Sequence, residues 1–279
     1  MDDERLRVLV TGGTSGLGAA LAAAYADRGA RVLVGAKGPD SVHGLVPNDV
    51  PQGRDAAVWD QTAGISVRQL DVRSDDDWAA AVGWVEQQWG GLDVLVNNAG
   101  VAGGGRVDVT GLDEWQWITE TNLFGVVRGT RAFVPMMKRQ GSGRIVNVAS
   151  VAGLVHPAGM GSYNAVKAAV VAFTETIGHE LAGHGIHASV VCPSYFRTRL
   201  MDSSWSRDEA VGRVLGHLVE TSPLGPDDIA AAVLEGLDRG EELILPDPAA
   251  EAAYRLKRED RAEYDRVMRA QAAKLEEAT

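Results

Sequence analysis

The sequence predicts an α/β fold in which a doubly wound parallel sheet of about seven strands carries helices on both faces. Short runs of β-branched and other apolar residues alternate along the chain with longer, alanine-rich stretches of helical character. Most of the apolar runs are nearly continuous, which is typical of parallel strands buried on both faces. Strands joined in this way by helices form right-handed crossovers, so a parallel sheet follows.

The expected elements can be placed along the chain. The strands are expected at Leu6–Val10, Arg31–Val34, Ser66–Leu70, Asp93–Val96, Arg144–Val148, His187–Val191 and Glu242–Leu245. The helices are expected at Leu17–Arg28, Asp75–Trp89, Leu112–Arg139, Ser162–Leu181 and Pro226–Asp238. Residues 38–64 are rich in Gly and Pro, which favours a loop or a short helix there. No linker or repeat divides the chain, so we expect one domain over residues 1–247 and a helical extension over 248–279.

Composition excludes several classes of partner. The net charge of −11 argues against nucleic acid and anionic lipid, because both would repel the chain. Cys192 is the sole cysteine, so no internal disulfide can form, which suits a reducing cytosol. The acidic start is unlike a signal peptide, and no apolar run is long enough to span a membrane. We therefore expect a soluble, cytoplasmic protein that acts on a small molecule.

A glycine-rich motif follows the first expected strand and opens a helix. It reads Thr11-Gly12-Gly13-Thr14-Ser15-Gly16-Leu17-Gly18. Glycines let the backbone approach a pyrophosphate, and the helix N-terminus offers free N–H groups and partial positive charge. By itself the motif is also compatible with a plain strand-to-helix turn, but its place after the first strand favours a nucleotide site.

Two further motifs lie where ligands of open α/β sheets bind. Asn97-Asn98-Ala99-Gly100 ends the fourth expected strand, at the carboxyl edge of the sheet, although it is also compatible with an ordinary turn. Tyr163 and Lys167 are four residues apart and share one face of a helix. A lysine ammonium about 4 Å from a phenol supplies roughly the 4 kcal/mol that lowers its pKa from about 10 to about 7. Ser150 follows the fifth expected strand. A serine there either caps a loop or donates a hydrogen bond to a substrate oxygen.

Together, in this order and spacing, these motifs resemble those of the short-chain dehydrogenases/reductases, single-domain enzymes with a Rossmann fold; the resemblance covers about residues 5–245. It implies that Tyr163 exchanges a proton with the substrate oxygen while hydride moves between nicotinamide and carbon. It implies that Lys167 lowers the pKa of Tyr163 and holds the nicotinamide ribose, that Ser150 orients the substrate oxygen, and that Asn122 helps to hold a proton-relay water. The resemblance also implies a cofactor site formed by Gly12, Thr14, Ser15, Gly16, Leu17, Gly18, Asp71, Val72, Asn98, Ala99, Gly100, Tyr163, Lys167, Pro193 and Thr198. Asp71 is the expected partner of the adenine amino group.

Two departures from the family pattern bear on the cofactor. The usual Pro-Gly after the sixth strand is Pro193-Ser194 here, so we expect a somewhat different loop with the Thr198 contact retained. NAD-preferring relatives place an acid at the end of the second strand, where this chain has Ala36 followed by Lys37. Lys37 either binds the 2′-phosphate of NADP or is a solvated loop residue. We therefore expect NADP, with NAD as the alternative.

The substrate is the least predictable part of the site. A segment over about residues 194–222 corresponds to a substrate lid, and its apolar residues suggest a hydrophobic, ring-containing carbonyl or alcohol. The candidate pocket residues are Tyr195, Phe196, Leu200, Met201 and Trp205 from the lid, with Val155, His156 and Met160. His179, His184 and His187 lack the spacing of a zinc motif, so no metal is expected.

Other classes of protein remain as alternatives. A regulator that senses NADP(H) without chemistry is disfavoured, because Asn122, Ser150, Tyr163 and Lys167 occur together. A sugar-nucleotide epimerase or dehydratase is disfavoured, because the chain lacks a large C-terminal substrate domain. We expect a homodimer or homotetramer, since relatives associate through the two long helices at about 112–139 and 162–181.

Overall fold

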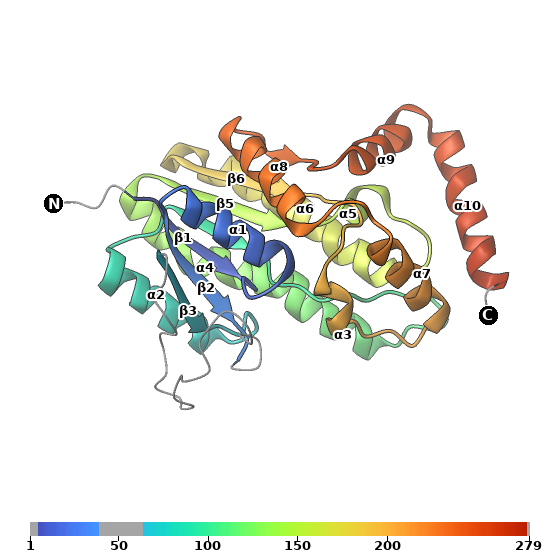
Figure 1. The fold of residues 1–279 in the computed structure, drawn as a ribbon, viewed down its shortest axis with the longest axis horizontal. Coiled ribbons are helices and arrows are strands. Elements are labelled where there is room, and N and C mark those ends of the chain that lie inside the picture. The colour runs from blue at the N-terminus through green and yellow to red at the C-terminus, as the bar shows by residue number, and fades with distance from the viewer. Residues whose placement is uncertain (1–4, 39–63, 278–279) are drawn as a thin grey trace.

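The computed structural model describes residues 5–38 and 64–277 and confirms the predicted doubly wound α/β fold (Figure 1). Seven parallel strands form one sheet in the order β3-β2-β1-β4-β5-β6-β7. The strands are β1 Arg7–Thr11, β2 Arg31–Ala36, β3 Ile65–Gln69, β4 Val94–Asn97, β5 Gly143–Val148, β6 Ile186–Val191 and β7 Leu243–Ile244. Because β2 and β4 both flank β1, the chain reverses direction across the sheet there, which is where doubly wound folds bind ligands.

Helices connect the strands and cover both faces of the sheet. They are α1 Gly16–Asp27, α2 Asp75–Trp89, α3 Leu112–Thr119, α4 Gly125–Gln140, α5 Ala152–Val155, α6 Gly161–Leu181, α7 Glu209–Glu220, α8 Pro226–Asp238, α9 Pro248–Glu259 and α10 Arg261–Glu277. Ser74 is the N-cap of α2, since its side chain accepts a hydrogen bond from the Asp77 amide. The loop expected over 38–64 falls almost entirely outside the described residues.

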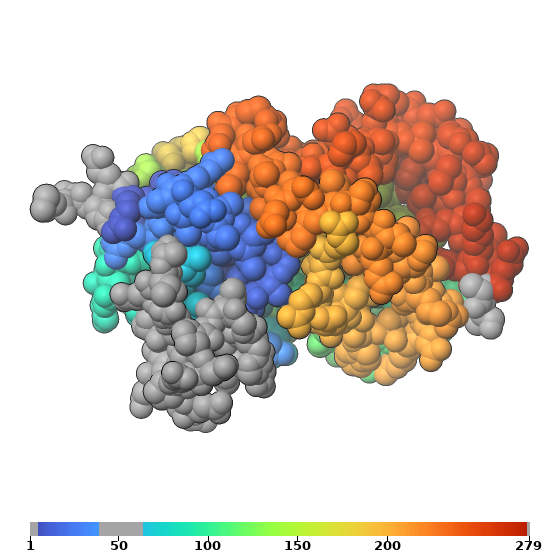
Figure 2. Space-filling model, in the orientation of Figure 1, coloured from blue at the N-terminus to red at the C-terminus, as the bar shows by residue number. Residues whose placement is uncertain are grey.

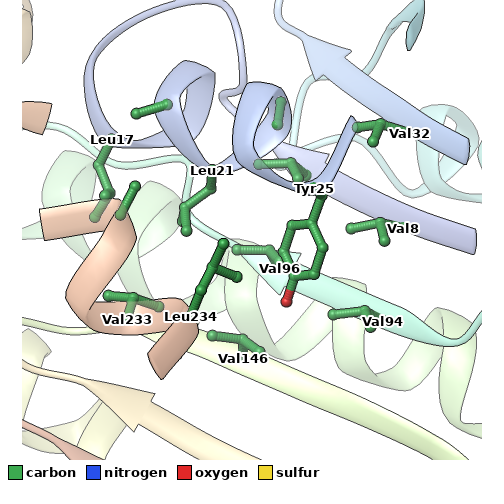
Figure 3. Close-up of a cluster of buried hydrophobic side chains, with 14 of the residues drawn as sticks. Val8, Leu17, Leu21, Tyr25, Val32, Val94, Val96, Val146, Val233 and Leu234 are labelled. Atoms are coloured by element: carbon green, nitrogen blue, oxygen red, sulfur yellow. The ribbon is translucent and has the colours of Figure 1, made fainter. Parts of the chain in front are cut away.

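Successive strand residues pack against opposite helical layers. Val8 and Val10 of β1 belong to a cluster with α1 and α8, shown in Figure 3, whereas Leu9 between them packs with α2, α4 and α6. All three side chains are at most 1% exposed. This two-sided burial explains why the strands read as continuous apolar runs. The parallel pairing of all seven strands puts their carboxyl ends at one edge of the sheet.

The helix expected over Leu112–Arg139 is interrupted. Residues Glu120–Phe124 form a π-helical turn (η3) between α3 and α4, and Asn122 lies within it. A π-helical turn redirects side chains and is frequent at functional sites. Here it turns the amide of Asn122 toward the chain that follows β4, as described below.

The C-terminal third also differs from the sequence-based expectation. The segment expected to be a lid contains a short 3₁₀ turn (η5, Arg199–Ser203) and the helix α7, whose apolar stripe packs inward. The helical extension expected over 248–279 consists of two helices, which meet at Asp260. They lie at the opposite end of the molecule from the N-terminus (Figure 1). None of the helices in the described parts of the chain has the length and apolar character needed to cross a bilayer.

Candidate active site

The carboxyl ends of the strands open into one large cavity of about 1410 Å³. Residues that follow β1, β2, β3, β4, β5 and β6 all contribute to its lining. This convergence results from the parallel register, in which, for example, Thr11 at the end of β1 pairs with Gly35 of β2. The cavity therefore lies where ligands of open α/β sheets bind.

The glycine-rich turn forms one wall of the cavity. Gly12 has a φ of +61°, and a Cβ at this position would lie 2.9 Å from the Cα of Ala99, so any side chain would collide with the backbone that follows β4. The turn leads into the N-terminus of α1, whose first turn contains no acidic residue and whose N-cap Ser15 makes no side-chain cap. Free N–H groups and the positive end of the helix dipole therefore face the cavity, which fits the phosphates of a dinucleotide.

Asn98 joins the glycine-rich turn to the chain after β4. Its side-chain amide donates to the carbonyl oxygens of Thr11 and Gly12 at 3.0 and 3.2 Å. The Thr11 hydroxyl in turn accepts from the amides of Asn98 and Ala99. Gly18 does not line the cavity; a Cβ there would overlap the Gly12 carbonyl and the Asn98 amide. Gly18 thus holds α1 against the turn, and Asn98 and Ala99 stabilise the turn from the other side.

Charged side chains border the part of the cavity beyond β2 and β3. Asp71, Val72 and Lys37 all line it. Both carboxylate oxygens of Asp71 accept from the guanidinium of Arg73, at 2.9 and 2.6 Å, which lowers the pKa of Asp71; a smaller contribution comes from Lys37. Asp71 is therefore a carboxylate held in place by an arginine that the sequence analysis did not single out.

Tyr163, Ser150 and Lys167 line the same cavity. Tyr163 and Lys167 lie on α6, and both are almost completely buried. The Nζ atom of Lys167 donates to the Val148 carbonyl at 3.0 Å and lies 5.6 Å from the centre of the Tyr163 ring. Ser150 follows β5, and its Oγ accepts from the Ala152 amide at 3.1 Å, which fixes it at the first turn of α5. The structure thus brings together a phenol, a hydroxyl and an ammonium.

The ionisation of these groups differs from the expectation of a tyrosine pKa near 7. Burial raises the pKa of Tyr163 to about 12, opposed by its hydrogen bond with Ser150. Burial lowers the pKa of Lys167 to about 8. The reason is that both groups leave water, and the Lys167 ammonium is directed at a backbone carbonyl rather than at the phenol oxygen. In this arrangement the phenol is held in its protonated form, ready to donate a proton.

Asn122 does not line the cavity. Its side chain is 1% exposed and pairs with both backbone groups of Val101, accepting from the amide at 2.8 Å and donating to the carbonyl at 2.9 Å. Val101 does line the cavity, directly after Gly100. The amide of Asn122 therefore fixes the position of the segment that follows β4.

The loop after β6 closes the cavity above the glycine-rich turn. Pro193 and Thr198 both line it, and a Cβ at Gly16 would lie 2.7 Å from the Thr198 hydroxyl. Ser194, at the departure from the family pattern, donates both its amide and its hydroxyl to the carboxylate of Asp247. Asp247 is buried and caps the N-terminus of α9. The serine thus connects this loop to the C-terminal extension.

The remaining walls of the cavity are mainly apolar. Of the predicted pocket residues, Tyr195, Phe196, Leu200, Met201, Val155 and Met160 line it. Trp205 and His156 do not: Trp205 packs edge-on against Trp117, and His156 pairs with Lys257 of α9. His179, His184 and His187 lie in α6, in the 3₁₀ turn after it and in β6; no group of metal-ligating side chains occurs within residues 5–38 and 64–277.

Sequence reasoning missed part of the lining. Arg73 is two residues beyond Asp71, so the Asp-x-Arg spacing was a signal that the two side chains pair. Met268 and Gln271 of α10 also line the cavity. The sequence predicted a helical extension there, but helical periodicity shows only that a helix has a buried face and cannot show what that face covers.

Comparisons with known proteins agree with this geometry. Residues 7–209 match the family model for short chain dehydrogenases. The chain is 34% identical over 213 residues to a 3-alpha-(or 20-beta)-hydroxysteroid dehydrogenase of Mycobacterium tuberculosis, covering 76% of each chain. It is 34% identical over 196 residues to a 3-oxoacyl-(acyl-carrier-protein) reductase of Synechocystis, covering 70% of this chain and 76% of that one.

Solved structures show the same fold. A short-chain dehydrogenase/reductase from Burkholderia phymatum in complex with NAD has a TM-score of 0.80 and 29% identity, covering 93% of this chain and 95% of the other. A short-chain dehydrogenase from Burkholderia cenocepacia in complex with NADP has a TM-score of 0.76, covering 96% and 99%; at 24% identity this likeness concerns the fold alone.

Proposed function

The chain belongs to the short-chain dehydrogenase/reductase family of oxidoreductases, and on this basis we propose that it transfers a hydride between NADP(H) and a carbonyl or secondary alcohol. The observation that carries the proposal is that Tyr163, Ser150 and Lys167 line the same cavity as the glycine-rich turn. When bound, the nicotinamide supplies or accepts the hydride. The side chains of this chain bind the substrate oxygen and move the proton.

In the reducing direction, Tyr163 donates its proton to the carbonyl oxygen as the carbonyl carbon gains a hydride, which yields a secondary alcohol and a phenolate. Ser150 holds the oxygen by a hydrogen bond. The high pKa of Tyr163 keeps the donor protonated at neutral pH, so it favours reduction. A pKa raised by about two units opposes ionisation by roughly 2.7 kcal/mol.

We propose NADP(H) rather than NAD(H) as the cofactor. Ala36 stands where an acid would bind the ribose 2′-hydroxyl, and Lys37 next to it lines the cavity. The charge of Lys37 also lowers the pKa of Asp71, so the two side chains lie within electrostatic range of each other, which supports a role for Lys37 near the proposed adenine site. A 2′-phosphate between these positions gains a cation, whereas an NAD ribose gains nothing comparable. The bound NAD in the Burkholderia phymatum relative makes NAD(H) the alternative.

The substrate proposed for this site is apolar and contains a ring. Tyr195, Met201 and Met160 line the cavity and pack in the same apolar cluster as Tyr163. The similarity to a hydroxysteroid dehydrogenase is consistent with a bulky, apolar ketone or alcohol. Apolar walls with a few polar groups at one end fix the orientation of such a compound.

The test follows oxidation of NADPH and NADH by absorbance with acetophenone and larger aryl ketones. Tyr163→Phe should abolish turnover, since it removes the transferred proton while leaving the ring in place. Tyr254→Phe is the matched control, because Tyr254 of α9 lies outside the cavity, and it should retain turnover. Turnover that survives in Tyr163→Phe would refute the assignment of the proton donor. Turnover with NADH alone would refute the cofactor preference.

We also propose that the protein is a homodimer or homotetramer that associates through the helices of residues 112–139 and 162–181. Multi-angle light scattering of the purified protein tests this proposal. A monomer at micromolar concentration would contradict it.

A further inference from the structure

We propose that the C-terminal extension, α9 and α10, forms the far wall of the substrate site, and that Gln271 selects an elongated apolar ketone or alcohol with a hydrogen-bonding group at its far end. The inference rests on the proposed function, because it concerns the substrate of the same cavity. It extends that function by assigning a substrate shape and a specificity-determining residue. The residue lies outside the part of the chain matched by the family model, which ends at residue 209.

One face of α10 is turned toward the catalytic domain. Tyr264, Met268, Gln271 and Leu275 recur at spacings of four, three and four residues, so they form a single stripe along the helix. Tyr264 and Leu275 at the two ends of this stripe are 5% and 4% exposed. Met268 and Gln271 between them line the cavity that also contains Tyr163. Figure 2 shows the extension beside α7 and α8 on the same face of the molecule.

Gln271 is the polar member of this otherwise largely apolar stripe. Its side-chain amide makes no hydrogen bond to any of the residues that the structure describes, although it borders the cavity. A glutamine amide can donate and accept at once, so it suits a hydroxyl, a carbonyl or an amide of a ligand. Gln271 is half-buried. Met268, one turn away on the same stripe, is apolar, as are other lining residues such as Leu215 and Leu218, and these side chains offer it no hydrogen-bonding partner. Gln271 is therefore placed to recognise one polar group on an apolar compound.

The start of the C-terminal extension is held by the loop that follows β6. Asp247 accepts from both the amide and the hydroxyl of Ser194 while it caps α9 through the Ala250 amide. Asp247 is 3% exposed, so these charge-assisted bonds are shielded from water. Pro248 and Ala249, next along the chain, line the cavity. The base of the wall is thus held by the same loop that carries Pro193.

Two further contacts hold the extension along its length. Lys257 of α9 donates to the Leu154 carbonyl and to Nδ1 of His156 at 2.7 Å, so Nε2 of His156 carries the proton it shares with the Gly153 carbonyl. Near the C-terminus, Leu275 packs over Gly159, where a Cβ would lie 2.6 Å from the leucine Cδ1. These contacts reach the segment between Ser150 and Tyr163. The wall is therefore fixed to the chain that carries the proton donor.

The pattern implies the shape of the substrate. Its reacting carbon lies at Tyr163 and Ser150, its apolar body passes Met160 and Tyr195, and its polar end meets Gln271. A site that hydrogen-bonds a substrate group discriminates against the analogue without it, because the partner in the protein stays unpaired. Short ketones end before they reach α10, so they should be indifferent to its side chains.

The experiment compares three ketones with NADPH. Acetophenone is the short probe; para-(hydroxybutyl)acetophenone carries a distal hydroxyl; para-pentylacetophenone is its isostere with a methyl group in place of that hydroxyl. The variant is Gln271→Leu. The matched control is Arg269→Leu, which replaces another polar residue of α10 that is exposed and does not line the cavity.

In the wild-type protein we expect kcat/KM to be roughly tenfold higher for the hydroxybutyl ketone than for the pentyl ketone, because one hydrogen bond of about 1.4 kcal/mol to Gln271 corresponds to a tenfold difference. Gln271→Leu should abolish or reverse this ratio through KM and leave acetophenone turnover unchanged, whereas Arg269→Leu should keep the ratio. A ratio that persists in Gln271→Leu, with acetophenone still reduced, would overturn the inference and leave the proposed function standing. Absence of turnover with all three ketones in the wild type would refute both.

A second variant tests the wall independently of Gln271. Lys257→Met removes the contacts of α9 with Leu154 and His156 without altering a lining residue. We expect it to reduce the preference for the hydroxybutyl ketone severalfold and to keep acetophenone turnover. An unchanged preference, with circular dichroism and melting temperature like those of wild type, would show that the extension does not need this contact to form the wall, and would count against the proposal.

Discussion

Replacing Asn122 by alanine should destabilise the protein and disturb the site without removing any group that lines it. The side chain makes two hydrogen bonds, to the amide and to the carbonyl of Val101, in an almost fully buried position. Alanine cannot replace either bond, and Val101 cannot form them with strand neighbours because it lies beyond the end of β4.

The size of the effect follows from these two bonds. Each buried bond contributes about 1 kcal/mol, and a group left unpaired costs more, so the free energy of unfolding should fall by roughly 2–3 kcal/mol. With an m-value of about 3 kcal/mol/M for urea, the unfolding midpoint should move down by roughly 0.7–1 M. The kcat/KM should fall as well, since the segment after Gly100 loses its fixed position beside the cavity.

Urea unfolding followed by fluorescence, together with turnover of acetophenone, tests this prediction. Gln116→Ala is the control, because it removes an amide side chain from an exposed position on the preceding helix α3. If Asn122→Ala unfolds at the same midpoint as Gln116→Ala, the two bonds contribute nothing to stability and the reasoning is refuted. A stable variant that lacks turnover would instead mean that Asn122 acts in the proton relay and not in positioning.

Three further predictions concern the cofactor, the proton donor and the extension. Lys37→Ala should raise the KM for NADPH by roughly tenfold or more, because it removes a charge-assisted hydrogen bond to the 2′-phosphate. The KM for NADH should stay unchanged. Equal effects on the two cofactors would contradict the assignment of Lys37 to the 2′-phosphate. The pKa of Tyr163 is raised to about 12, and reduction needs the protonated phenol whereas oxidation of the alcohol needs the phenolate. The rate of reduction should therefore stay level through neutral pH, while the rate of alcohol oxidation should rise with pH. Measured pH–rate profiles in both directions test this, and a rate of reduction that already falls at neutral pH would contradict it. Ser194→Gly introduces the residue usual in the family and removes one hydrogen bond to Asp247 of about 1 kcal/mol, so it should lower kcat/KM for para-(hydroxybutyl)acetophenone by roughly fivefold. The kcat/KM for acetophenone should not change. Equal losses with both ketones would show that Ser194 affects only the loop after β6 and not the C-terminal extension.

The sheet was predictable because burial on both faces leaves a local record in the sequence. Val8, Leu9 and Val10 are all apolar since their neighbours pack in opposite layers, and each of the seven expected strands overlaps an observed one. The turn from Gly12 to Gly18 was predictable for a similar reason: only glycine avoids the collisions of that turn with Ala99 and with the Gly12 carbonyl itself. The π-helical turn at Asn122 was not predictable, because helical periodicity does not record a single inserted residue.

Local sequence patterns were sufficient to predict the order of the strands along the chain, the apolar core and the residues at the carboxyl edge, because these depend on neighbours within a few positions. The surroundings of those residues depend on the tertiary structure. It placed Asn122 against Val101 instead of the cavity, and it buried Tyr163 so that its pKa rises. It also brought Gln271 to the same cavity as Tyr163, which lies more than a hundred residues earlier in the chain. Burial and long-range contact depend on how the whole chain packs, so a local pattern cannot fix them.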